Sequence, residues 1–325
     1  MINIEIGENE QNQRLDRFLK KYLNEAPLSY IYKAIRKDVK VNGKRASEDT
    51  VLNIGDEVTL YIKDDDLAEL TRKPERTAAK RQFKIAYEDD NIIAVEKPFG
   101  LLTHGDKTEK KNHLANQVVD YLIEQGSYNP RAERTFTPAP VNRLDRNTTG
   151  LVLFGKNNTA LQELNRLIRE KDKIEKFYLT IVCGRLTKEL HLKDKMIKDS
   201  TINKITVLPE DAEGREMETI VRPLKAGRDY SLAEVEIVTG RSHQIRAHLA
   251  KAHHPVIGDV KYGDRRANRY IKTKFGWNTQ LLHAYKLVFG EIDGPLAYLS
   301  GKTITAQPPE DFARIEEELF SKNSY

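Results

Sequence analysis

The sequence predicts an α+β protein with a small N-terminal domain and a larger C-terminal domain, and three observations lead to this. The chain has 325 residues, which is long enough for two domains, and 39% of them are hydrophobic, which can supply at least one substantial core. Runs with strand-like alternation outnumber runs with helical spacing. Residues 64–81 begin with three aspartates, contain Pro74 and show no sustained apolar periodicity. We therefore expect domains at residues 1–63 and 82–325, joined by a linker at 64–81.

The small domain is expected to begin with two helices and to end with short strands. Between residues 15 and 23, apolar residues recur at helical spacing, and Ser29 is placed to cap a second helix. A short strand at 39–41 is followed by Asn42-Gly43, the pair that a two-residue hairpin turn favours. A second apolar run at 58–62 supplies another strand. A unit with this pattern is small but able to fold.

Positive charge is concentrated in this small domain. The chain has a net charge of +5 and a pI of about 8.9, which permits a polyanionic partner without requiring one. From Arg14 to Arg45 there are ten Lys or Arg and three Asp or Glu, a net of +7, so the rest of the chain sums to −2. Such residues can form a solvated basic face, but their clustering on a helix and its exit favours contact with phosphates. The expected RNA contacts are Arg14, Arg17, Lys33, Arg36, Lys37 and Lys40.

The large domain should contain more strands than helices. Its expected helices are at residues 114–122, ending near Gly126, and at 161–168, which begins with the spacing of a capping box. Apolar and acidic residues alternate at 233–237, which predicts a sheet with one solvated face. We expect a mixed or antiparallel sheet that forms the floor of a cleft. The expected strands are residues 91–96, 150–155, 177–183, 232–238 and 285–289.

Cysteine use and hydropathy exclude several classes of protein. Cys183 is the single cysteine, so an intramolecular disulfide and a thiolate metal cluster are excluded, and we expect Cys183 to be a buried strand residue. His243 and His248 lack the i, i+4 spacing of a helical metal pair, so no metal is expected. The N-terminus lacks the features of a signal peptide, and no stretch approaches the roughly 20 apolar residues of a membrane span. We expect a cytoplasmic protein with no membrane contact.

The most informative motif is Asn-Arg-Leu-Asp-Arg-Asn-Thr-Thr-Gly at residues 142–150. It places Asp145 between the guanidiniums of Arg143 and Arg146, on a polar loop that runs into an apolar strand. An aspartate on such a loop is most often a turn former. Here, however, the flanking arginines can hold phosphate oxygens and favour the ionised carboxylate. The motif predicts an anionic substrate, with Asp145 as the candidate catalyst.

This motif resembles the catalytic loop of the RluA-type pseudouridine synthases, which usually reads His-Arg-Leu-Asp followed by Thr-Ser-Gly or Thr-Thr-Gly. The chain has Asn142 where many members have histidine, and Asn147 where aspartate is common. Two further motifs of the family are present in the expected order, Lys-Pro-Phe-Gly at 97–100 and Gly-Arg-Ser-His-Gln-Ile-Arg at 240–246. The resemblance continues through Pro-Val-Ile-Gly-Asp at 255–259, Tyr262-Gly263 and Leu-His-Ala at 282–284, and it runs over almost the whole chain.

The N-terminal segment has a resemblance of its own. The order of its expected helices and strands, with Arg-Leu-Asp at 14–16 and Val-Asn-Gly at 41–43, resembles the RNA-binding domain of the S-four family of ribosomal proteins. This S-four-like domain, attached through a hinge at 64–81, would bind one part of a large RNA while the other domain works elsewhere on it.

The resemblance implies the pseudouridine synthase fold, a long bisected antiparallel sheet with flanking helices and an RNA cleft. It also implies the isomerisation of uridines in structured RNA, with large-subunit ribosomal RNA as the expected partner and with no cofactor. In this family pattern Asp145 is the catalyst, Tyr178 stacks on the flipped uracil and assists proton transfer, and Arg246 orients Asp145. Supporting contacts to the substrate are expected from Arg143, Lys97, His104, Arg241 and His243.

The residues leave several alternatives open. Asp145 can act as a nucleophile at the anomeric carbon or as a base that removes a sugar proton. Tyr178 can be an ordinary core tyrosine, and the turn between Lys97 and His104 can be purely structural. An inactive ribosome-associated RNA-binding protein and a synthase acting on transfer RNA are the other candidates, while a glycosidase-like hydrolase would need a second positioned carboxylate. We expect a monomer.

Overall fold

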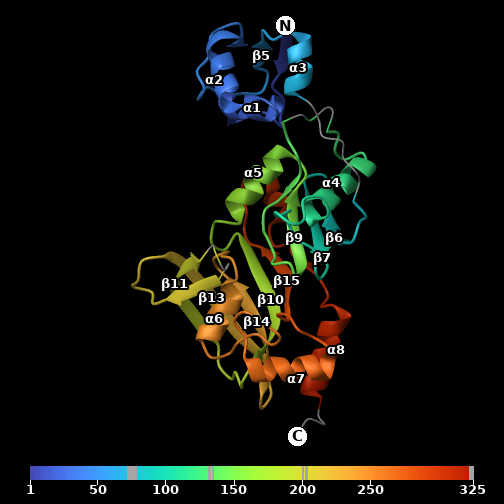
Figure 1. Cartoon of the computed structure of the whole chain (residues 1–325), viewed down its shortest axis with the longest axis vertical. Helices are drawn as coiled ribbons and strands as arrows, with labels where there is room; N and C mark the ends of the chain where they lie inside the picture. Colours follow the sequence, from blue (N-terminus) through green and yellow to red (C-terminus); the bar gives the residue numbers. More distant parts are fainter. Residues whose placement is uncertain (72–78, 131–132, 134, 200, 202–203, 322–325) are drawn as a thin grey trace.

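The computed structural model describes residues 1–71, 79–130, 133, 135–199, 201 and 204–321. Its first unit is a small three-stranded antiparallel sheet, in the order β1-β5-β3, packed against helices (Figure 1). Phe18, Leu19, Ile31 and Leu60 are almost completely buried and form part of a core confined to this unit. The elements are β1 (Ile2–Glu5), β2 (Gln13–Arg14), α1 (Leu15–Tyr22), α2 (Leu28–Lys37), β3 (Val39–Val41), β4 (Val51–Leu52), β5 (Glu57–Leu60) and α3 (Asp64–Leu70).

The turns and caps of this unit agree in part with the sequence prediction. Asn42 and Gly43 have φ values of 50° and 72°, and their turn is closed by two backbone hydrogen bonds of 2.9 and 3.0 Å, so the predicted Asn-Gly turn is confirmed. The predicted cap by Ser29 is wrong. The carbonyl of Pro27 already accepts the first bonds of α2, which places Ser29 inside the first turn of the helix.

Helix α3 occupies the first part of the expected linker. Leu67 and Leu70 pack against the core of the first unit, and the carbonyl of Leu70 accepts the backbone N–H of Glu25 at 3.1 Å. The three aspartates lie in the first turn of α3, where the helix dipole favours negative charge. Two leucines in seven residues are too short a pattern to stand out in the sequence. Residues 72–78 of the expected linker, including Pro74, lie outside the described residues.

The second unit is built on one eleven-stranded sheet. Nine strands follow the order β12-β11-β13-β14-β10-β15-β9-β7-β6, while β16 pairs with β15 and β8 pairs with β9. Among the described strands every pairing is antiparallel except that of β9 with β15. The predicted mixed, mainly antiparallel sheet is confirmed. Its strands are β6 (Lys84–Glu88), β7 (Ile92–Lys97), β8 (Ala139–Pro140), β9 (Thr149–Gly155), β10 (Ile174–Cys183), β11 (Leu190–Asp199), β12 (Lys204–Leu208), β13 (Arg215–Ala226), β14 (Tyr230–Ile237), β15 (Leu282–Phe289) and β16 (Thr303–Thr305).

The parallel contact bisects this sheet next to the motif at residues 142–150. His283 pairs with Thr149, and Ala284 pairs with Gly150. Gly150 has a φ of 110°, and a Cβ atom there would lie 2.0 Å from the carbonyl oxygen of Ala284, so glycine is required for this approach. The hydroxyl of Thr149 and Nδ1 of His283 share a hydrogen bond of 2.8 Å. The Thr-Gly pair of the motif therefore joins the two halves of the sheet.

Helices and loops cover the central strands on both sides (Figure 1). In β9, Leu151 and Leu153 belong to a core shared with α5, while Val152 and Phe154 belong to a core shared with α4. Burial on both faces explains the unbroken apolar run of this strand. The alternation at 233–237 is confirmed, because its two glutamates are half-buried and its apolar residues are buried. The helices are α4 (Leu114–Glu124), α5 (Asn158–Leu167), α6 (Gln244–Lys251), α7 (Arg265–Phe275) and α8 (Glu310–Phe320), with the 3₁₀ helix η1 (Gly294–Leu299).

Two local features differ from the sequence prediction. The capping box of α5 is wrong, because Asn157 is the N-cap and its side chain accepts the N–H of Ala160 at 2.8 Å. Cys183 ends β10 and is half-buried. Among the described residues, no helix is both long and apolar enough to cross a bilayer.

His248 on α6 predicts a pH-dependent stability. Its ring is buried, with Nδ1 2.8 Å from the hydroxyl of Thr219 and Nε2 3.5 Å from Oδ2 of Asp194. Burial, opposed by the charge of Asp194, lowers the pKa of His248 to about 4, against about 6.5 in an unfolded chain. Between these values the unfolded chain binds the proton and the folded protein does not. The free energy of unfolding should therefore fall by up to about 3 kcal/mol as the pH drops from about 6.5 to about 4.

Urea unfolding at a series of pH values between 4 and 7.5 measures this loss. The variant His248→Asn removes the titrating group, so the difference between parent and variant isolates it from the other histidines and the carboxylates. We expect the variant to lose less stability than the parent over this range. Equal losses would contradict a buried neutral imidazole at this position.

Candidate active site

Hydrogen bonds of Asn142 and Leu144 hold the part of the β8–β9 loop that precedes Asp145. The Nδ2 group of Asn142 donates to a backbone carbonyl of β9 at 3.1 Å, and its Oδ1 atom accepts a backbone N–H of β9 at 2.9 Å. Leu144 is buried, and its N–H and carbonyl both bond to the hydroxyl of Thr103, at 3.2 and 3.1 Å. Asn142, which stands where the family loop usually has histidine, thus extends the pairing of β8 with β9 into the loop.

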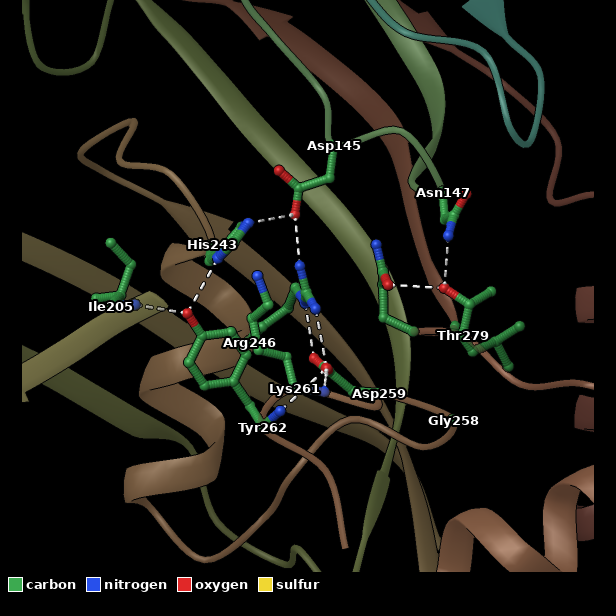
Figure 2. Close-up of polar contacts among 12 residues, drawn as sticks. Asp145, Asn147, Ile205, His243, Arg246, Gly258, Asp259, Lys261, Tyr262 and Thr279 are labelled. Carbon is green, nitrogen blue, oxygen red and sulfur yellow. Dashed lines mark hydrogen bonds and ion pairs between the residues drawn. The ribbon is translucent and has the colours of Figure 1, made fainter. Parts of the chain in front are cut away.

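A buried arginine of α6 holds Asp145. Nη1 of Arg246 donates to Oδ2 of Asp145 at 2.9 Å, and Nε and Nη2 donate to the two carboxylate oxygens of Asp259 at 2.6 and 2.9 Å (Figure 2). The Asp259 side chain is fully enclosed and also accepts the backbone N–H groups of Lys261 and Tyr262, at 2.8 and 3.1 Å. Asp145 keeps 29% of its side chain exposed. One arginine therefore bridges a buried carboxylate and an accessible one.

Burial and ion pairing shift the pKa values of Arg246 and Asp259 in opposite directions. Burial alone would lower the pKa of Arg246, but its bonds to Asp259 and Asp145 raise that pKa above the ordinary value. Burial alone would raise the pKa of Asp259, but Arg246 and the two backbone N–H groups lower it below the ordinary value. Arg246 therefore remains a cation and Asp259 an anion over the whole physiological pH range.

His243 lies next to Asp145, and Tyr262 lies next to His243. His243 precedes α6 in the left-handed conformation, with a φ of 53°. Its Nε2 atom lies 3.8 Å from Oδ2 of Asp145, and its Nδ1 atom lies 3.0 Å from the hydroxyl of Tyr262 (Figure 2). That hydroxyl accepts the backbone N–H of Ile205 at 2.7 Å, so its own proton is available for Nδ1. Burial, opposed by Asp145, lowers the pKa of His243, which favours the neutral ring.

Tyr178 lies on β10 and faces the same pocket. Burial, with a further contribution from the charge of Asp145, raises the pKa of its phenol above the ordinary value. Tyr178 is therefore a neutral phenol at physiological pH. A neutral aromatic ring in the same pocket as the Asp145 carboxylate is suited to contact a planar base.

Lys97 ends β7 and is buried beneath the loop. Its Nζ atom donates to the carbonyls of Pro98, Leu101 and Arg146, at 3.1, 2.8 and 2.9 Å. Burial, partly opposed by Asp145, lowers the pKa of Lys97 to about 7. Its contacts thus join the Lys-Pro-Phe-Gly turn to the backbone of the loop that carries Asp145.

These elements surround a pocket with a volume of about 480 Å³. Within the described part of the chain, Asp145 is the one acidic residue in its lining, and five cationic side chains accompany it. The pocket therefore suits a polyanionic substrate and chemistry by a single carboxylate. The predicted site residues in its lining are Asp145, Tyr178, Arg246, Arg143, His104, Arg241 and His243, and the structure brings all seven together. Lys97 does not belong to this lining.

The arginines on either side of Asp145 have other surroundings than the sequence suggested. Arg146 lies 3.5 Å from Asp106, and Arg143 is an exposed residue of the pocket wall. In the described part of the chain neither forms an ion pair with Asp145. The guanidinium next to Asp145 comes from Arg246, 101 positions further along the chain. Two residues of this centre, Asp259 and Tyr262, were not predicted as site residues, although both stand in segments that follow the family pattern.

The six predicted RNA contacts lie on the first unit, apart from this pocket. Arg14 forms an ion pair of 3.1 Å with Asp16, and Nζ of Lys40 lies 5.3 Å from the centre of the Tyr61 ring. The remaining four are exposed on α1 and α2, which gives these helices a basic surface. They are Arg17, Lys33, Arg36 and Lys37.

Comparison with known proteins identifies the family. Residues 91–251 match the family model described as RNA pseudouridylate synthase. The chain is 32% identical over 292 residues to "Ribosomal large subunit pseudouridine synthase C" of Vibrio vulnificus, which covers 88% of this chain and 87% of the relative. It is 32% identical over 294 residues to the protein of the same name from Escherichia coli (strain K12), covering 88% of each. An "Uncharacterized RNA pseudouridine synthase" of Mycoplasma capricolum is 31% identical over 308 residues, 93% of this chain and 96% of the relative.

A solved structure has the same fold. "Human RNA Pseudouridylate Synthase Domain Containing 4" superimposes with a TM-score of 0.56 at 20% identity, covering 72% of this chain and 92% of that one. The family model spans the loop with Asp145, the strand with Tyr178 and the helix with Arg246. The chain belongs to the RNA pseudouridylate synthase family.

Proposed function

We propose that the protein isomerises specific uridines of large-subunit ribosomal RNA to pseudouridine, with Asp145 as the catalyst. The observation that carries this proposal is the arrangement around Arg246, in which Asp259 is buried and Asp145 alone faces the pocket. The names of the curated relatives from Vibrio vulnificus and Escherichia coli support the ribosomal substrate. Family membership supports the reaction.

The proposed reaction begins when the target uridine leaves its stack and enters the pocket. Tyr178 packs on the uracil, and Arg143 occupies the space that the base has left. Asp145 then attacks the anomeric carbon, or removes a sugar proton, and the bond from N1 to the sugar breaks. The uracil turns and forms a new bond from C5 to the same carbon, as the bond from Asp145 to that carbon breaks or as Asp145 returns the sugar proton. The proton on C5 then leaves, and N1 gains one. No electrons are exchanged with a cofactor, so none is required.

Residues 1–63 are proposed to form an S-four-like RNA-binding domain, and residues 82–325 the catalytic domain. The expected linker at 64–81 begins with α3, which packs against the first unit. The separate core of the first unit and the basic surface of α1 and α2 support this division. We propose that the protein acts as a monomer. Substrate contacts are proposed for His104, Arg241 and His243, and a loop-positioning role for Lys97.

Release of tritium from C5 tests the reaction and its substrate together. Transcripts of large-subunit ribosomal RNA and of transfer RNA, each labelled with tritium on C5 of uridine, are incubated with the protein. We expect a small, fixed number of tritium atoms to be released per molecule of ribosomal transcript, and no release from transfer RNA. Release from transfer RNA alone would reassign the substrate. Tight binding of the ribosomal transcript without release from either RNA would instead indicate an inactive RNA-binding protein.

A hydrolase is distinguished by the product. Cleavage without rejoining would liberate free uracil and leave an abasic sugar, which chromatography of the same reactions would detect. Because the described pocket lining has Asp145 as its one carboxylate, the second acid that glycoside hydrolysis requires is missing from it. We therefore expect no free uracil.

A further inference from the structure

Helix α7 lies in a further concentration of positive charge, to which the proposed function assigns no role. Residues 260–276 contain six Lys or Arg and one Asp, a net of +5. Residues 14–45 contribute +7, and residues 72–84, with six Lys or Arg and one Glu, contribute another +5. Since the whole chain has a net charge of +5, all other residues together sum to −12. The segment around α7 is therefore one of three that carry most of the positive charge, and its helix belongs to the catalytic unit.

The cations of α7 lie on its exposed side. Arg265, Arg269 and Lys272 follow one another at i, i+4 and i+7, which places them along one face over about 10 Å, and Arg266 adjoins that face. The opposite side carries the buried Ile271 and its neighbour on the next turn, Phe275. In the described structure none of the side chains of Arg265, Arg266, Arg269 and Lys272 takes part in an ion pair or a hydrogen bond. These four guanidinium and ammonium groups are free for an external anion.

Helix α7 is joined directly to the segments that hold the catalytic loop. Asn268 accepts the N–H of Gly258 at 2.7 Å and donates to the carbonyl of Asp259 at 2.8 Å. Asp259 is the carboxylate that binds the arginine next to the catalytic loop. Beyond the helix, the hydroxyl of Thr279 accepts the side-chain N–H of Asn147 at 3.0 Å (Figure 2). An anion held on α7 is therefore held in a defined position relative to the pocket.

An exposed aromatic ring lies beyond the C-terminal end of α7. Trp277 packs against Phe99 with ring centroids 5.2 Å apart, and Phe99 is 49% exposed. Phe99 belongs to the Lys-Pro-Phe-Gly turn, which Lys97 joins to the catalytic loop. Cations for a phosphate backbone together with an exposed ring for a base form the combination found on nucleic-acid-binding surfaces. An acidic protein surface would use the cations alone.

The geometry points to α7 as a second RNA-binding surface, one that holds the phosphate backbone of the substrate RNA on the side of the pocket away from the first unit. In Figure 1, α7 lies at the end of the molecule opposite α1 and α2, with the long strands β10 and β15 between them. This assignment rests on the proposed function, because the RNA it holds is the substrate of Asp145. Contacts of this kind position the RNA without reading its sequence.

The test compares two triple variants of the full-length protein with equal loss of charge. The first replaces Arg265, Arg266 and Arg269 with glutamine, and the matched control replaces three exposed cations elsewhere, Lys84, Lys188 and Arg228. Affinity for the ribosomal transcript is measured at salt concentrations from about 50 to about 300 mM. Over this range, phosphate contacts make the affinity fall steeply as the salt concentration rises. We expect the α7 variant to bind the transcript at least about tenfold more weakly than the parent. The slope of log affinity against log salt concentration should be smaller in magnitude by about 2. The control should match the parent.

Arginine-to-lysine changes at the same three positions keep the charge and should retain the salt dependence of the parent, which separates loss of phosphate contacts from misfolding. Single-turnover tritium release at saturating protein should be unchanged in the glutamine variant, because Asp145 is untouched. An α7 variant with the affinity and salt dependence of the parent would overturn the assignment and would leave an acidic protein as the partner of α7. A parent that binds through α7 but releases no tritium would instead refute the isomerisation alone.

Discussion

Replacing Asp145 with asparagine is expected to lower the rate of pseudouridine formation by about 10⁴-fold or more. Asparagine has the same shape and can still accept the bond from Arg246, but it can neither attack the anomeric carbon as an anion nor remove a proton. RNA affinity should remain within a few-fold of the parent. Tritium release measures the rate, and filter binding of the ribosomal transcript measures the affinity.

The matched control for this change is Asp211→Asn. Asp211 is an exposed acid outside the pocket lining, so its loss alters the net charge of the protein equally without touching the site. We expect the control to keep the parent rate. Substantial release by Asp145→Asn would contradict the proposed chemistry, since the described pocket lining offers no other carboxylate to replace it.

Replacing Arg246 with methionine is expected to lower kcat by about 10²- to 10³-fold with a smaller change in KM, because Asp145 loses the bond that aims it. The change also leaves Asp259 buried without its cation, which should reduce the free energy of unfolding by about 3–5 kcal/mol. Urea unfolding and single-turnover kinetics measure the two effects separately.

The double variant Arg246→Met with Asp259→Asn separates positioning from folding. It removes both buried charges, so much of the lost stability should return, while Asp145 remains without its partner and the rate should stay low. Recovery of the rate together with the stability would contradict a positioning role and would make Arg246 a residue of folding alone. Continued instability of the double variant would show that the two backbone N–H groups facing residue 259 require an anion.

Local patterns determined more of the fold than of the site. The apolar run of β9 and the spacing within α4 and α5 predicted their elements, because each depends on which residues face a core. Helix α3 was not predicted, and the N-caps of α2 and α5 were predicted at the wrong residues. The residue at which a helix begins depends on single hydrogen bonds to a side chain or a backbone carbonyl, which the apolar pattern does not contain.

For the site, the sequence alone determined its candidate residues through three short motifs, and seven of them line one pocket. Only the tertiary structure decided which charges meet. The sequence placed Arg143 and Arg146 beside Asp145, yet the fold brings Arg246 to it from 101 positions away and closes the group with the buried Asp259. The basic face of α7 likewise became visible only when the helix was formed and its apolar side was packed. Electrostatic contacts depend on distance in space and on burial, and neither is encoded in the spacing of residues along the chain.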